Sequence, residues 1–347
     1  MSLLESIISH QIWLQRTASG EVKDLAPFIQ EMRGEIKRQV LLFGDDGRST
    51  ARLNKLLRDL EKALTGLTDD WQTKLTEDLK ELAAYEAEWN VKALVANVNA
   101  EFVTPGAEQV WAAAEFQPLS LSDKPVDFTK LMSGWGETEV ARLVTGVKMG
   151  FVQGQTTRQI VKNVVGAGGL ADISERNAAT VTRTALSHVS SEARNETYRQ
   201  NGDIIEKYEW VSTLDSRTST ICRARDGMTW EIGKGPLPPA HPNCRSTTAP
   251  VISSEFDFLD KGAKRAARAA DGGTQVSADT TSYEFLKQQP AWFQDEALGP
   301  VRGEIFRNSG ITAEEFRVIS VDGFGRPLTL KEMAELDKRV ADYLKEE

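Results

Sequence analysis

The stretch that decides the fold is WVSTLDSRTSTICRARDGMTWEIGKGPLPPAHPNCRSTTAPV, residues 210–251. It contains both cysteines of the chain, Cys222 and Cys244, together with His241, one of only three histidines. It also contains the densest run of prolines in the sequence. A loop-rich segment with few apolar side chains cannot form a core of its own. We therefore expect these three side chains to hold the segment together.

The three side chains have the chemistry of metal ligands. His241 and Cys244 are spaced H-x-x-C, so one turn brings both to a single ion, and Cys222 reaches it from across the loop. Zinc takes four tetrahedral ligands, or three ligands and a water molecule. Asp226 or Asp215 would be the fourth ligand. The pattern requires no cofactor, but it is compatible with zinc.

Three interpretations of this group remain open. The first is a structural clip, formed either by a Cys222–Cys244 disulfide or by a zinc site. The second is simple burial, with two reduced thiols behaving as small apolar groups beside a hydrogen-bonded His241. The third is catalysis, with a cysteine as nucleophile and His241 as base. No residue is an obvious candidate for the third group that would orient the histidine in a catalytic site. A proline-rich loop is also a poor rigid support for catalytic side chains.

The segment before this stretch is predicted to be helical from about residue 137. Thr156 and Gln159 form a capping box, which predicts a helix start near residue 157. The glycine-rich residues 166–169 end that helix, and another helix runs over about 174–200. The pattern then changes to short runs of β-forming residues, at 204–213, 228–232 and 247–252. We expect a small sheet that leans on the preceding helix.

Residues 1–136 are predicted to form an N-terminal helical region. One series of leucines has the spacing of a single helix face: Leu53, Leu56, Leu57, Leu60 and Leu64. Such helices pack into a bundle or offer a docking surface to a partner, and the two do not exclude each other. Residues 101–136 carry three prolines and predict an irregular connection. Of the other histidines, His188 is expected to be a satisfied core residue, whereas His10 carries no signal.

The chain after the central stretch divides into two parts. Residues 255–281 are small and polar and predict a flexible linker. Four basic side chains in it are candidates for DNA contact, with a solvated linker as the alternative: Lys261, Lys264, Arg265 and Arg268. Residues 282–347 contain capping boxes that begin at Thr281, Thr312 and Thr329, so a helical region is expected. Its aromatic residues Trp292, Phe293 and Phe306 are expected in the core.

Composition limits the class of protein. The chain has 347 residues and a net charge of −9, so it does not coat nucleic acid by neutralising phosphates along its whole surface. No run of about 18 apolar residues predicts a transmembrane helix, and the N-terminus lacks the pattern of a signal peptide. Two cysteines do not form a secreted disulfide framework. We predict an α+β protein that is mostly α-helical.

Several motifs taken together resemble the phage Mu protein F-like family of minor head proteins, also called phage head morphogenesis proteins. The helix ERNAATVTRTALSHVSSEARNETY (175–198) is followed by a strand with Trp210 and then by D-x-R-T (215–218). Cys222, an Asp-Gly pair (226–227) and PPAHPNCR (238–245) come next. The segments YEFLKQQPAWFQDEALGPVRGEIF and RPLTLKEMAEL resemble the region that follows this domain in many members. The combination is more specific than any single motif.

The sequence departs from the family at two positions. Members commonly carry C-x-x-C in the first block and C-R-C in the second, but Arg225 and Ser246 stand where the additional cysteines would be. One departure in each block is expected if the missing cysteines paired with each other. The resemblance therefore implies that Cys222 and Cys244 face each other as the remaining pair, and it weakens a zinc site because two soft ligands are missing.

The resemblance implies a role in the virion and no enzymatic activity. Family members are minor capsid proteins, made late, that associate with the portal vertex and act in head assembly and in DNA packaging and ejection. The implied partners are the portal protein, other head proteins and the phage genomic DNA. The implied location is the phage head, and the host cytoplasm during assembly. The alternative is a thiol- or metal-dependent hydrolase or transferase that uses Cys222, His241 and Cys244.

The predicted organisation follows from these patterns and the resemblance together. It consists of an N-terminal helical region that docks to a partner (1–136), an F-like domain (137–254), a flexible linker (255–281) and a C-terminal helical region (282–347).

Overall fold

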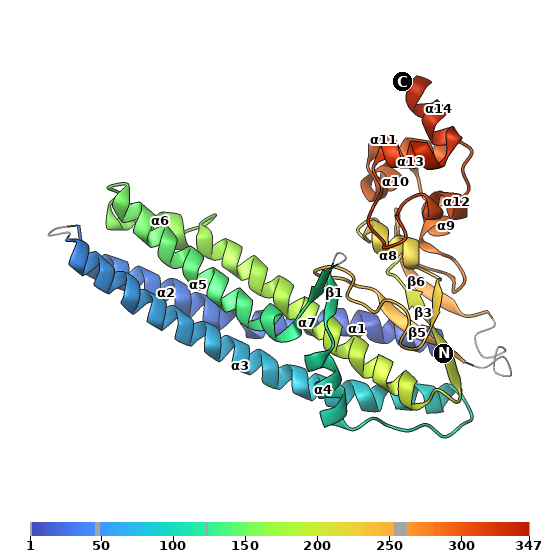
Figure 1. The fold of residues 1–347 in the computed structure, drawn as a ribbon, viewed down its shortest axis with the longest axis horizontal. Helices are drawn as coiled ribbons and strands as arrows, with labels where there is room; N and C mark the ends of the chain where they lie inside the picture. Colours follow the sequence, from blue (N-terminus) through green and yellow to red (C-terminus); the bar gives the residue numbers. More distant parts are fainter. Residues whose placement is uncertain (1, 46–48, 122–123, 253–261, 347) are drawn as a thin grey trace.

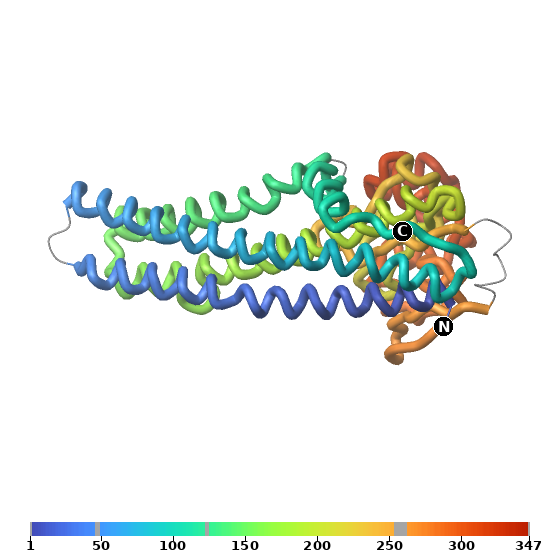
Figure 2. Tube along the Cα trace, turned by 90° about the horizontal axis from the view of Figure 1, so that it is seen from below, coloured from blue at the N-terminus to red at the C-terminus, as the bar shows by residue number. Residues whose placement is uncertain are grey.

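The structure is a computed structural model that describes residues 2–45, 49–121, 124–252 and 262–346. It consists of a long helical bundle that carries, at one end, a small β-sheet and a cluster of short helices (Figure 1). The N-terminus lies at the end that carries the sheet (Figure 2). The predicted fold class, α+β and mostly α-helical, is confirmed.

The bundle contains the helices α1 (Leu3–Asp24), α2 (Ala26–Phe43), α3 (Thr50–Asn97), α5 (Phe128–Val152), α6 (Thr157–Val165) and α7 (Leu170–Gln200). The predicted capping box at Thr156 is present and starts α6, because the threonine side chain and Gln159 satisfy the free N–H groups of the first turn. Residues 44–49 separate α2 from α3. The buried residues of α3 recur at helical spacing from Leu56 to Leu94, so its one apolar face packs against α2, α5 and α7.

One continuous core runs through these helices. It includes Ile36 of α2, Leu60 and Trp71 of α3, Leu143 of α5 and Ala185 of α7. The predicted division between residues 136 and 137 therefore falls inside helix α5 and cuts this core. The main apolar faces of α1, α2 and α3 are buried against the helices that follow, and docking of residues 1–136 to a partner stays a prediction.

A buried polar network fastens α1 to the bundle. His10 Nε2 lies 2.6 Å from Glu86 Oε1, and Ser190 of α7 donates a 2.8 Å hydrogen bond to the other oxygen of Glu86. The His10 ring stacks on Trp89 at a centroid distance of 3.5 Å. Glu86 is fully buried, so its charge needs these partners. His10, which carried no signal in the sequence, is therefore a contact between three helices.

The connection from α3 to α5 is more regular than predicted. It contains α4 (Ala107–Phe116) and a two-stranded hairpin of β1 (Leu119–Leu121) and β2 (Lys124–Val126). Helix α4 packs on α3 and α7. His188 of α7 is buried, with Nε2 2.7 Å from the Ala114 carbonyl oxygen, which confirms that it is a satisfied core histidine.

The predicted small sheet is present. Strands β4 (Thr229–Glu231), β3 (Ile205–Val211) and β5 (Thr247–Ile252) lie in that order and are antiparallel. Tyr198 at the end of α7 donates a hydrogen bond to the Thr248 carbonyl at 3.3 Å, so the sheet leans on the helix that precedes it.

The prediction of a flexible linker is wrong for residues 264–277. They form an antiparallel hairpin of β6 (Lys264–Ala269) and β7 (Gly272–Ser277). Alternate residues of β6 are buried, among them Arg265 and Ala267, and the Arg268 N–H donates to the Leu214 carbonyl. A run of small residues allows this strand to lie close against its neighbours. Residues 253–261, including Lys261, lie outside the described residues.

The C-terminal helices are short and share a second core. They are α9 (Ser282–Lys287), α10 (Ala291–Leu298), α11 (Pro300–Asn308), α12 (Ala313–Val318), α13 (Leu330–Leu336) and α14 (Lys338–Glu346). All three predicted capping boxes are present. Phe293 and Phe306 are buried as predicted, but Trp292 is 57% exposed. It directly precedes Phe293 on α10, and the two rings meet edge to face at 5.6 Å.

Candidate functional site

The central stretch places its three candidate side chains on two elements. Cys222 lies in α8 (Thr220–Arg225), which begins at Ser219, whose side chain accepts a hydrogen bond from the Cys222 N–H. His241 and Cys244 lie on the loop between β4 and β5. A tight turn joins them, with the Cys244 N–H donating to the His241 carbonyl at 3.1 Å. Asn243 has a φ of 59° in that turn, a conformation that asparagine tolerates better than most residues.

The structure brings Cys222, His241 and Cys244 together. The two sulfur atoms are 3.6 Å apart, and Cys222 Sγ is 3.3 Å from His241 Nε2. One ligand atom from each residue falls within 4.8 Å of the others. Both cysteines are buried, beside the fully buried Trp210. The sulfur atoms are farther apart than the roughly 2 Å of a disulfide bond, so both are thiols in this structure.

Hydrogen bonds within this group shift the pKa values of its members. The hydrogen bond from Cys222, helped by the nearby imidazole, lowers the pKa of Cys244 well below that of a free thiol despite burial. The same hydrogen bond, together with burial, raises the pKa of Cys222. Burial lowers the pKa of His241, but Cys244 and the Pro242 carbonyl outweigh it, and the net pKa is raised. The pKa shifts of the two cysteines thus run in opposite directions, and Cys244 is the more acidic thiol of the pair.

The carboxylates proposed as a fourth ligand lie elsewhere. Asp226 is almost fully buried and forms an ion pair with Arg265 at 3.0 Å. It also accepts hydrogen bonds from the Ser212 N–H and from the N–H and hydroxyl of Ser282. Asp215 binds both terminal nitrogens of Arg245. The assignment of Asp226 as a ligand is therefore wrong, since both its oxygens are used to join the sheet to β6 and α9.

The remaining three residues fit a zinc ion. Zinc–sulfur bonds of about 2.3 Å and zinc–nitrogen bonds of about 2.0 Å place tetrahedral ligand atoms roughly 3.4–3.8 Å apart. Two of the three pairs lie at 3.3 and 3.6 Å, and all three ligand atoms lie within 4.8 Å of one another. The His241 Nδ1 lies 2.9 Å from the Pro242 carbonyl oxygen. In the neutral ring this contact favours a proton on Nδ1, and the lone pair of Nε2 then faces Cys222, where a metal ion would bind.

The two positions that depart from the resembled pattern both lie beside the core around Cys222 and Cys244. The Arg225 guanidinium lies over the Trp210 ring, 5.2 Å from its centroid. Ser246 Oγ lies 3.3 Å from Ser212 Oγ. The arginine and the serine thus interact with two different neighbours in the same small core around Cys222 and Cys244.

Residues 141–249 match the model of the family described as phage Mu protein F like protein. This part of the chain is similar to phage Mu F-like proteins. The match covers just under a third of the sequence and confirms the resemblance drawn from the motifs. No curated protein and no solved structure matches the chain significantly.

The F-like match includes Cys222, His241 and Cys244 and all of strands β3 and β4. The match starts inside α5 and ends inside β5. It therefore contains the whole of helix α7 and the loop that carries the turn 241–244. Within the described residues, no helix is both long and apolar enough to cross a membrane.

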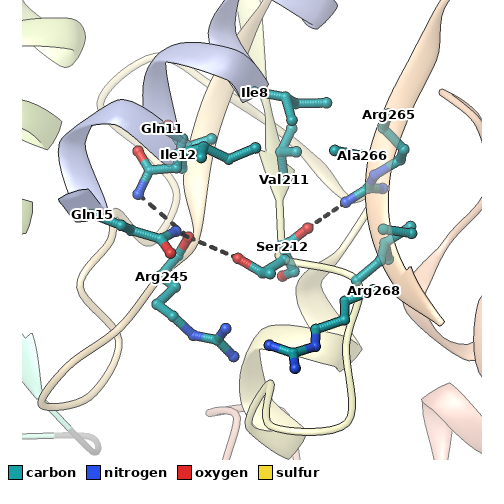
Figure 3. A pocket seen from close by; sticks show the side chains of 14 residues that line it. Ile8, Gln11, Ile12, Gln15, Val211, Ser212, Arg245, Arg265, Ala266 and Arg268 are labelled. Carbon is teal, nitrogen blue, oxygen red and sulfur yellow. Dashed lines mark hydrogen bonds between the residues drawn. The ribbon is translucent and has the colours of Figure 1, made fainter. Parts of the chain in front are cut away.

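The candidate DNA-contacting residues are not equivalent. Arg265 is only 3% exposed and donates to Asp226, to the Ser212 carbonyl and to the Thr280 carbonyl. Figure 3 shows its side chain directed at Ser212, inside the seam between α1 and the strands. It cannot contact DNA without breaking the ion pair, so its assignment is wrong. Lys264 and Arg268 are exposed on β6, and Lys261 lies outside the described residues.

The same seam contains residues that the sequence did not single out. Gln11 and Gln15 of α1 donate to the Arg245 carbonyl at 3.3 and 3.4 Å (Figure 3). Ser212 donates to the Cys222 carbonyl at 2.8 Å. These contacts attach the cysteine loop to a helix more than 200 positions earlier, and no local pattern announces a pairing over that distance.

Proposed function

We propose that this chain is a minor head protein of a tailed phage, associated with the portal vertex and active in head morphogenesis and in DNA packaging and ejection. The observation that supports the proposal is the match to phage Mu F-like proteins over residues 141–249, which runs from α5 through α6 and α7 of the bundle to the sheet at its other end. The bundle has its own core, so its free end is the part that is available to neighbouring head proteins.

The free end of the bundle carries apolar side chains that no described residue covers. Leu42 near the end of α2 is 75% exposed and Val152 at the end of α5 is 66% exposed. The two helix ends lie side by side, because the rings of Phe43 and Phe151 meet at 4.8 Å. Met149 is also exposed. Adjacent exposed apolar residues of this kind mark protein contact sites, and we assign this end to the docking of a portal or other head protein.

Paired substitution at this end tests the docking role. Leu42→Asp with Val152→Asp is expected to reduce incorporation of the protein into heads at least ten-fold. Its melting temperature should stay within a few degrees, since both side chains are already in water. The measurement is the copy number per purified head by quantitative mass spectrometry. Deleting residues 1–100 is a poorer test, because it removes half of the shared core.

The control is Phe324→Asp, which changes an 83% exposed aromatic residue in the C-terminal region. It should be incorporated normally. Normal incorporation of the bundle-end variant would refute docking through this end, and equal loss in both variants would mean that any exposed acidic substitution interferes.

We also propose that Cys222, His241 and Cys244 act as a structural clip, closed by zinc or by the thiols alone. Of the candidate DNA-contacting residues, Lys264 and Arg268 are exposed on β6, and we propose that these two contact packaged DNA. Binding of DNA through them should weaken steeply with salt concentration.

A further inference from the structure

A cavity of about 510 Å³ lies between α1, α7 and the loop that carries Cys244. Four arginines line it: Arg183, Arg194, Arg217 and Arg245. They come from two turns of α7, from the turn after β3 and from the residue that follows Cys244. None of the described residues that line the cavity is acidic. The protein as a whole has a net charge of −9, so this concentration of positive charge is local.

Two of these arginines have their charge balanced within the protein. Arg245 donates from both terminal nitrogens to Asp215. Arg194 donates to Ser190 Oγ at 3.1 Å and lies 4.0 Å from Glu86. Arg194 is nevertheless only 2% exposed, and its Nε has no hydrogen-bond partner among the described residues. A buried N–H that lacks an acceptor costs about 1–3 kcal/mol, so this donor calls for an acceptor that the chain does not supply.

The other two arginines have no countercharge. Neither Arg183, which is half-buried on α7, nor Arg217, which is exposed on the turn, forms an ion pair with any described residue. Ser187, one turn after Arg183 on α7, adds a hydroxyl to the same lining. The cavity thus combines two guanidinium groups that form no ion pair with the described residues and a neutral donor.

We propose that this cavity binds a phosphate group. Guanidinium groups offer planar pairs of N–H donors that match the oxygen atoms of a phosphate. The volume lies in the range of small-molecule sites, about 300–1,000 Å³. A recessed site of this kind accepts a free phosphate ion or a terminal phosphate that projects into it, rather than the backbone of an intact duplex lying on the surface. The inference rests on the cavity alone and does not depend on docking through the bundle end.

The test measures binding of inorganic phosphate to the full-length protein by calorimetry and by the shift of its melting temperature, at an ionic strength held constant with chloride. Wild-type protein should bind phosphate and melt at a higher temperature in its presence. The double variant Arg183→Gln/Arg217→Gln should bind at least ten-fold more weakly. Arg176→Gln is the matched control, since it removes an exposed arginine of the same helix outside the cavity.

Equal binding by wild type and the double variant would overturn the proposal, as would a wild-type response to phosphate no larger than the response to chloride. If the double variant melts well below wild type without ligand, the single variant Arg217→Gln takes its place, because that side chain is exposed. Once the site is established, competition identifies the source of the phosphate. Displacement by a 5′-phosphorylated oligonucleotide but not by its unphosphorylated form assigns a nucleic-acid end, and displacement by neither assigns a free phosphate ion.

Discussion

Glu192 shows how one buried residue couples this fold to pH. It lies on α7, is 5% exposed, and burial raises its pKa to about 7 even though Asn195 and Arg199 act in the other direction. The folded protein therefore binds a proton at this site that the unfolded chain, with a pKa near 4.5, releases. The resulting stabilisation is complete below pH 4.5 and is lost as the pH rises through about 7.

Glu192→Gln should remove the loss of stability that the ionisation of Glu192 causes as the pH rises. Between pH 5 and pH 8 the free energy of unfolding of wild type should fall relative to that of the variant, by at most about 3 kcal/mol. His188, whose pKa burial lowers to about 4, titrates in both proteins and cancels in the comparison. The measurement is urea unfolding at several pH values. Parallel stability curves for the two proteins would show that Glu192 titrates normally.

The clip formed by Cys222, His241 and Cys244 makes a second prediction at the residue scale. If zinc closes it, adding Zn²⁺ to the reduced protein should raise the melting temperature by several degrees, because the ion binds only the folded state. Cys244→Ala should abolish this rise, and Mg²⁺ should have no effect on either protein. If Zn²⁺ does not change the melting temperature of the wild-type protein, the clip consists of a pair of buried thiols.

The sequence predicted the three members of this group but not their surroundings. Rare residue types in a proline-rich loop indicated which side chains would meet. The sequence suggested Asp226 as a fourth ligand. It could not show that Asp226 instead contacts Arg265 and Ser282, which lie on elements far along the chain. Charge type identifies a candidate ligand, but the partner that is nearest in space decides what the carboxylate does.

At the scale of elements, the β6–β7 hairpin is held by the Asp226–Arg265 ion pair. Asp226→Asn would leave the Arg265 charge buried without its partner, which typically costs about 3–5 kcal/mol. Lys264→Gln, on an exposed position of the same strand, should change stability by less than about 0.5 kcal/mol. Urea unfolding measures both variants. A loss below 1 kcal/mol in Asp226→Asn would mean that the hairpin is held mainly by its apolar contacts.

Elements with strong local signals were predicted well. Helix starts at Thr156, Thr281, Thr312 and Thr329 follow from capping boxes, which act within four residues. The β6–β7 hairpin has no such signal, since alanines and glycines favour no strand by themselves. Its strand structure depends on the contacts to Leu214 and Asp226, and a prediction from local pattern therefore described it as a linker.

At the scale of the whole molecule, the predicted domain boundary failed because packing does not follow sequence order. Prolines and glycines between residues 101 and 136 suggested a joint, yet α3 before this segment and α5 and α7 after it share one core. A fragment limited to the matched residues 141–249 would begin within α5 and lose α1, α2 and α3. We expect such a fragment to be largely insoluble, and soluble, cooperative unfolding of it would show that the bundle is dispensable.

Helix α3 has 48 residues, which gives it a length of about 70 Å at 1.5 Å per residue. It runs from the exposed end of the bundle towards the sheet (Figure 1), so the polypeptide acts as a spacer that keeps its two extremities a set distance apart. Helices α2, α5 and α7 pack along it and share its core. Evolution can therefore lengthen or shorten this spacer only by inserting or deleting matching turns in several helices at once.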